Sequence, residues 1–145
     1  MKHNLILRFI VKYLFPVIAL FALYVQFHGD YGPGGGFQAG IILSVAFIFY
    51  SLVFGLKTTE QVLPPGVLRI VMCTGVLIYA GTGVTTMLMG GNFLDYNLLS
   101  QNPIEGQHLG ILMIELGVGI TVSSVMLIIF FAFAGRGRPE EADHD

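Results

Sequence analysis

The sequence predicts an all-α integral membrane protein with four transmembrane helices. Of its 145 residues, 54% are hydrophobic and only 11% are charged, and the mean hydropathy is +0.77; soluble domains average about 25% charged residues. The few charges are also clustered, because no Asp, Glu, Lys or Arg occurs from Tyr31 to Leu56 or from Ile70 to Leu94. Each of these runs exceeds the roughly 20 apolar residues that a helix needs to cross a bilayer.

Composition also argues against several classes of function. A net charge of −2 gives the chain no basic surface for nucleic acid. No nucleophile–base pair typical of an enzyme is visible. Cys73 is the only cysteine, and no His and Cys cluster is present, so we expect no haem, iron–sulfur cluster, structural zinc or other cofactor.

The first transmembrane helix is expected at residues 5–27. Basic residues near the N-terminus precede an uncharged run from Tyr13 to Phe27, as in a secretory signal. No small-x-small cleavage site follows that run, so we expect the helix to be retained. Pro16 is expected to bend this helix or to mark its effective start.

A glycine-rich turn follows, and it is the most distinctive stretch of the chain. Five of the nine residues from His28 to Gly36 are glycine, which permits a sharp turn and a close approach of backbone to backbone or ligand. Asp30 and His28 either attract cations at an outer mouth or cap the turn. The residues expected to fix the turn and a subunit contact are His28, Gly29, Gly32, Pro33, Gly34, Gly35, Gly36, Phe37, Gln38 and Gly40.

The second helix is expected at residues 37–56 and the third at residues 67–89, with the helix-breaking Pro64-Pro65-Gly66 between them. Each carries a stripe of small or mildly polar residues: Gly36, Gly40, Ser44, Ser51 and Gly55 on the second, and Gly75, Tyr79, Thr82 and Thr86 on the third. Small residues mark close helix contacts in membranes, so the first stripe is either an internal packing face or a contact with another subunit. The second stripe either makes hydrogen bonds to a helix backbone or lines a water-filled path.

An apolar loop at residues 92–106 leads to the fourth helix at residues 107–134, and a charged tail at residues 136–145 ends the chain. We expect the loop to lie along the membrane interface or against another chain. Residues 1–135 then form one bundle-like membrane domain. All seven Lys and Arg lie near the N-terminus, in the second connector or in the tail, so the positive-inside rule predicts that both termini and the tail are cytoplasmic and that the glycine turn is outside.

Glu115 is the only Asp or Glu well inside a predicted span. A carboxylate in hydrocarbon is costly unless it is protonated, paired or hydrated, which makes Glu115 a candidate for the ion path; otherwise it only holds helices together. His108 shares its helix face about 10 Å away and is either a proton relay or an ordinary boundary histidine. We expect ion chemistry at Glu115 rather than in the glycine turn.

The turn motif His28-Gly29-Asp30-Tyr31-Gly32-Pro33-Gly34-Gly35-Gly36-Phe37-Gln38-Ala39-Gly40 resembles the signature of the B subunit of Mrp-type (also called Mnh-type) multisubunit Na⁺/H⁺ antiporters. A second match is Gly106-Gln107-His108-Leu109-Gly110, followed by Glu115-Leu116-Gly117-Val118. The opening from Leu7 to Pro16 also fits, so the resemblance covers nearly the whole chain.

The resemblance implies a small, multi-pass subunit of a cation/proton antiporter in a bacterial cytoplasmic membrane, which supports assembly and contributes to the ion path. The implied partners are the other Mrp subunits (A, C, D, E, F and G types), with Na⁺ and H⁺ as transported ions. In that family the large A and D subunits carry the main ion-translocating chemistry. The alternative is a purely structural membrane-arm subunit, of the antiporter or of a related hydrogenase-like complex. A self-contained channel or carrier made of identical copies is a third hypothesis.

Overall fold

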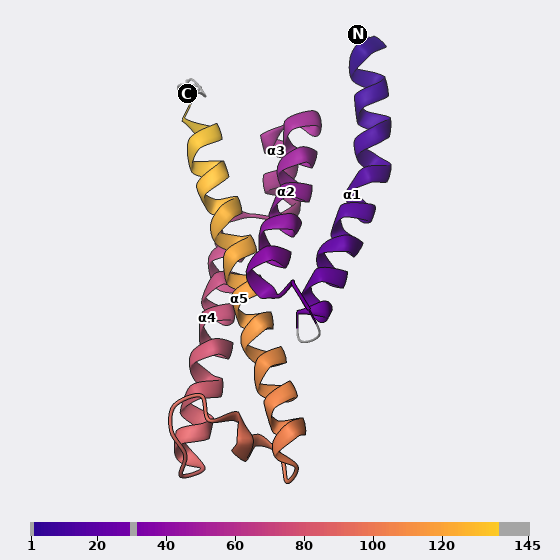
Figure 1. Ribbon diagram of the computed structural model, residues 1–145. Coiled ribbons are helices and arrows are strands. Elements are labelled where there is room, and N and C mark those ends of the chain that lie inside the picture. Colours follow the sequence, from indigo (N-terminus) through magenta and orange to yellow (C-terminus); the bar gives the residue numbers. More distant parts are fainter. Residues whose placement is uncertain (1, 30–31, 137–145) are drawn as a thin grey trace, which may run out of the picture.

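The computed structural model describes residues 2–29 and 32–136, and within them the chain is helical with no strand (Figure 1). Four long helices, α1 (Lys2–His28), α2 (Gly36–Phe54), α4 (Pro65–Leu88) and α5 (Pro103–Gly135), are each long and apolar enough to cross a membrane. This confirms the predicted fold class. Two short elements connect them, the helix α3 (Leu56–Val62) and the 3₁₀ turn η1 (Tyr96–Leu99).

The short helix α3 was not expected from the sequence. Gly55 ends α2 with a φ of +99°, a conformation that side chains other than glycine rarely adopt. The chain therefore turns and begins a new helix, in which the Thr59 hydroxyl is fully buried and donates to the Gly55 carbonyl at 3.3 Å. Leu56 and Leu63, at the two ends of this segment, pack on the buried cluster of Leu68, Leu127 and Phe131 between α4 and α5.

The helix α5 is the centre of the fold. α2 and α4 both pack along it, and α1 packs mainly on α2, so the four helices form an open row rather than a closed bundle (Figure 1). Close approach is possible because glycines meet backbone. A Cβ built on Gly40 would lie 2.7 Å from the Gly119 carbonyl oxygen, and one on Gly75 would lie 2.7 Å from that of Gly117.

The two predicted stripes can now be assigned. Gly36, Gly40, Ser44 and Ser51 are buried inside the chain, and Gly36 and Gly40 face α5, so the second-helix stripe packs internally at these positions; Gly55 lies outside the helix. On α4 the Thr82 hydroxyl donates to the Ile78 carbonyl at 2.8 Å, and the Thr86 hydroxyl donates to the Gly83 carbonyl at 2.8 Å. The backbone alternative is therefore confirmed for these two threonines.

The loop between α4 and α5 packs on the chain's own helices, an arrangement that was not among the expected ones. The Thr86 hydroxyl also contacts the Asn92 carbonyl at 3.1 Å and accepts from the Leu94 amide at 3.0 Å. The rings of Phe93 and Tyr96 lie where side chains on Gly83 and Gly110 would be. Burial, with a smaller contribution from Tyr79, raises the pKa of the Tyr96 phenol above its ordinary value, so this phenol is neutral at physiological pH.

The turn between α1 and α2 lies part of the way along α5 and not at its end (Figure 1). Gly36, the first residue of α2, contacts the backbone of Glu115. The start of α5 at Pro103 is ~18 Å further along the helix axis, at 1.5 Å per residue. α1 begins and α5 ends at the same end of the molecule (Figure 1), whereas the side of the membrane on which that end lies stays a prediction. Of the predicted tail, only Arg136 lies within the described residues.

Candidate functional site

Glu115 lies where α5 passes the glycine turn, and its carboxylate fits between two glycines. A Cβ built on Gly29 would be 2.5 Å from Oε1 and 2.7 Å from Oε2 of Glu115, and one on Gly35 would be 2.9 Å from Oε1. Real Cβ atoms do not approach other heavy atoms so closely. The carboxylate can therefore occupy this place only because both positions are glycine.

The turn itself is held by backbone contacts. The Gly35 amide donates to the Val25 carbonyl of α1 at 3.2 Å, and the Gly35 carbonyl accepts from the Ala39 amide at 3.0 Å. Gly35 has a φ of +107° and directly precedes α2. The carboxylate of Glu115 thus lies at the N-terminus of α2, where the partial positive charge of the helix attracts an anion.

Gln26 is a further polar residue of this region, and it was not among the site residues predicted from the sequence. It extends from α1 towards α5, and only 5% of its surface is exposed. Its Oε1 lies against Gly119, where a Cβ would be 2.5 Å away. Its Nε2 has no hydrogen-bond partner among the described residues. Because it is the only amide in the uncharged run from Tyr13 to Phe27, that rarity was the signal that could have identified it.

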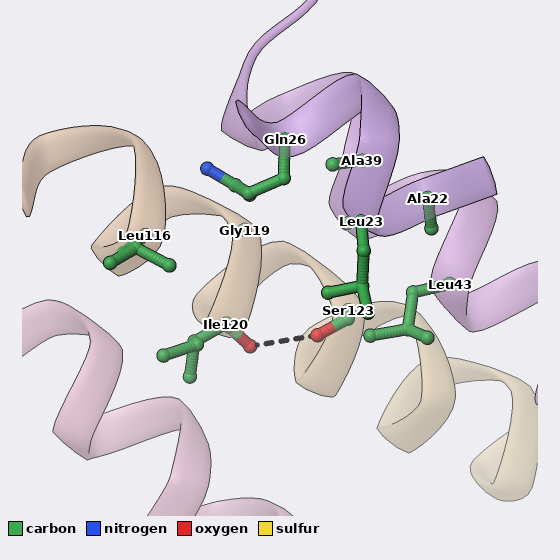
Figure 2. Close-up of a pocket in the computed structure, with 10 residues that line it drawn as sticks. Ala22, Leu23, Gln26, Ala39, Leu43, Leu116, Gly119, Ile120 and Ser123 are labelled. Carbon is green, nitrogen blue, oxygen red and sulfur yellow. Dashed lines mark hydrogen bonds between the residues drawn. The ribbon is translucent and has the colours of Figure 1, made fainter. Parts of the chain in front are cut away.

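Two hollows meet at Gln26. The larger is an open groove of about 480 Å³ beside the first turns of α5, lined by Gln26, Phe27, Glu105, His108, Leu109, Leu112 and Glu115. The smaller, of about 110 Å³, lies between α1, α2 and α5 (Figure 2). Its lining is mostly Ala, Leu and Ile, and the Ser123 hydroxyl beside it already donates to the Ile120 carbonyl at 3.1 Å.

The glycine turn and Glu115, which were predicted to have separate roles, lie in contact. Ion chemistry was expected at Glu115 rather than in the glycine turn, but Gly29 and Gly35 of that turn contact the Glu115 carboxylate directly. His108 lines the same groove as Glu115, as their shared helix face predicted. Asp30 lies outside the described residues.

The remaining motif residues divide into an inner and an outer set. Gly36 and Gly40 are buried against α5. Pro33, Phe37 and Gln38 are exposed on the surface of the chain. The ring of His28 stacks on Tyr24 of the same helix with 5.3 Å between ring centroids. Among the described residues, no three His, Cys, Asp or Glu side chains gather in a way that could hold a metal ion.

Comparison with known proteins gives one consistent result. Residues 6–128 match a family described as a domain related to the MnhB subunit of Na⁺/H⁺ antiporter. The chain is also similar to proteins of Staphylococcus aureus strains Newman, JH1 and Mu3 that carry the provisional name antiporter subunit mnhB2. Identity to each is 35% over 139 residues, which covers 93% of this chain and 98% of the relative.

Proposed function

This chain belongs to the family of MnhB-related subunits of Na⁺/H⁺ antiporters, and from that premise we propose that Glu115 is the residue through which it contributes to the ion path. As a member of that family the chain is a multi-pass membrane subunit of a multisubunit Na⁺/H⁺ antiporter, a transporter rather than an enzyme. The observation that carries the proposal is the fit of the Glu115 carboxylate between Gly29 and Gly35.

A single carboxylate can serve cation/proton exchange because it has two uncharged states. It is neutral when it carries a proton, and the ionised form is neutralised when Na⁺ binds to its oxygens, since carboxylate oxygen suits hard cations. Either state lowers the cost of a charge inside the membrane. The N-terminus of α2 stabilises the ionised form during the exchange.

The partners that we propose are the other subunits of an Mrp-type complex, of the A, C, D, E, F and G types, in a bacterial cytoplasmic membrane. Both termini are proposed to be cytoplasmic, because every Lys and Arg lies near a terminus or in the α2–α4 connection. The proposal that the chain works in a complex is supported by its few ionisable groups, because Glu115 is the only carboxylate well inside a predicted span. An antiporter must bind two ions in turn, so other subunits have to supply further groups.

A purely structural role is the competing proposal, and the glycine–backbone contacts of Gly36 and Gly40 favour it. There, Glu115 would only hold α5 to the turn. The two roles differ in one respect. A structural role predicts that losing Glu115 reduces the amount of complex, whereas an ion-path role predicts that the complex forms and transports poorly.

The test is a Glu115→Ala variant of a tagged chain, expressed with its partners in cells that lack the native copy. Affinity purification in mild detergent gives the amount of complex, and proton movement on addition of Na⁺ to everted vesicles gives antiport. We expect normal co-purification with impaired antiport. Glu60→Ala is the matched control, because it removes a carboxylate of α3, a helix that lies away from the turn (Figure 1). Normal antiport by an assembled Glu115→Ala complex would refute the ion-path role.

A further inference from the structure

The α1–α2 hairpin is too short to reach the outer end of α5. α1 ends at His28, and the glycine turn that follows it meets α5 at the level of Glu115, because Gly36 contacts the Glu115 backbone. α5 continues for a further ~18 Å beyond the level of Glu115. The glycine turn and Glu115 therefore lie ~18 Å short of the predicted outer end of α5.

The groove occupies the space beyond the tip of the hairpin. Glu105, His108, Leu112 and Glu115 follow one another at helical spacing along one face of α5, and all four line the groove. This face leads from the outer end of α5 to the carboxylate at the turn. Its volume of about 480 Å³ has room for on the order of ten water molecules at ~30 Å³ each.

Gln26 lines both the groove and the smaller hollow, and it independently indicates a polar ligand in the groove. The side chain is 95% buried and lines the groove, yet its Nε2 donates to no described residue. In Figure 2 this nitrogen extends over α5 on the side of Leu116, away from Leu43 and Ser123. A buried amide without a partner is costly, and a water molecule in the groove would satisfy it.

We infer that the groove is a water-filled vestibule that admits a hydrated monovalent cation, Na⁺ or hydronium, from the outer side to Glu115. The inference rests on the proposed role of Glu115 and adds the route by which the ion reaches it. Gln26 Nε2 donates to the oxygen of a water molecule that fills the inner part of the groove. Glu105, exposed at the outer end, raises the local concentration of cations at the mouth.

The smaller cavity defines where this vestibule stops. It lies on the other side of Gln26, and its lining is almost wholly apolar. A hydrated ion therefore finds fewer polar partners beyond Gln26, towards Leu43, than it finds in the groove. The polar lining of the vestibule thus ends at Gln26 and Glu115.

The test uses Leu112→Cys, which places a thiol in the groove, in a Cys73→Ser background so that no other thiol is present in this chain. Intact cells are treated with a cationic, membrane-impermeant methanethiosulfonate, and antiport is then measured in everted vesicles. The reagent needs a hydrated thiolate. We expect the thiol of Leu112→Cys to be modified at least tenfold faster than that of Val84→Cys, an exposed apolar position on α4. We also expect the modification to abolish antiport, and we expect added Na⁺ to slow the modification.

A rate of modification equal to that of Val84→Cys, or modification that leaves antiport unchanged, would overturn the vestibule. Leu109→Cys, also in the groove, provides a second position if Leu112→Cys does not assemble. A separate Glu115→Gln variant distinguishes the two proposals. If that variant loses antiport while both groove cysteines stay unmodified, Glu115 keeps its role and the vestibule is wrong. If it transports normally, the role of Glu115 is wrong whatever the cysteines show.

Discussion

At the scale of single residues, the site depends on the absence of a Cβ at Gly29 and Gly35. These two positions have no Cβ, and the carboxylate of Glu115 occupies the space that a Cβ would take. Gly35 has a second requirement, because its φ of +107° lies outside the range that L side chains commonly adopt. The same two glycines thus shape the turn and accommodate the ionisable group.

The glycine turn provides a matched pair of substitutions. Gly35→Ala is expected to push the carboxylate aside and to lower antiport by roughly 10- to 100-fold, because a shift of about 1 Å in a reacting group can have that effect. Gly32→Ala meets only the His28 ring, at 3.2 Å, and is expected to stay within about twofold of wild type. Both variants are assayed for Na⁺-driven proton movement at equal amounts of complex. Equal effects of the two substitutions would argue against the contact.

Substitution of Gln26 is expected to affect transport without lowering the stability of the complex. Gln26→Leu removes a buried amide nitrogen that has no described partner, so thermal stability is expected to be unchanged or higher. The Na⁺ concentration for half-maximal antiport is expected to rise about 2- to 10-fold, since one hydrogen bond contributes about 0.5–1.5 kcal/mol. Gln61→Leu on the exposed side of α3 is the control. A destabilised Gln26→Leu complex with an unchanged Na⁺ requirement would assign Gln26 to structure alone.

The sequence could identify Glu115 but not its surroundings. An isolated charge inside a hydrophobic run is visible in one dimension, and so is a concentration of glycines. Their contact joins residues far apart in the chain, and no periodicity within one helix reports it. Gln26 is visible in the sequence as the only amide in the uncharged run of α1, but its burial against α5 is visible only in the structure.

At the scale of helices, glycine positions decide which faces meet. On α4, Gly75 lies against Gly117 and Thr121 of α5, whereas a Cβ on Gly81 would meet nothing within 4 Å. Helix limits were predictable from hydropathy to within a few residues. The packing of the 92–106 loop was not, because its apolar side chains fill notches left by Gly83 and Gly110 on two different helices.

Two glycines of α4 therefore give opposite expectations. Gly75→Ala overpacks the contact with α5, and we expect it to lower the stability by about 1–3 kcal/mol. Gly81→Ala is expected to raise it by up to about 1 kcal/mol, because alanine favours the helix. The midpoint of thermal unfolding of the purified complex measures both. A Gly75→Ala complex as stable as the Gly81→Ala complex would contradict the packing of α4 on α5.

At the scale of the whole molecule, the open row of helices suits a subunit that works with partners. α5 and α4 extend beyond the α1–α2 hairpin at one end, which leaves Glu115 recessed and beside an open groove. The four spans and their order were predictable from charge and hydropathy. The offset of the hairpin was not, because it follows from the contact between Gly36 and Glu115 and not from the length of any span.

The most direct test of this account is antiport by the purified, reconstituted complex that carries Glu115→Gln. Glutamine keeps the size of the side chain and its place between the glycines, but it can neither release a proton nor carry a negative charge. With the complex fully assembled, we predict that Na⁺-driven proton transport falls by at least about 100-fold, as for the loss of a proton-transferring group. Transport within about twofold of the wild-type rate would contradict the account and leave Glu115 as a structural contact only.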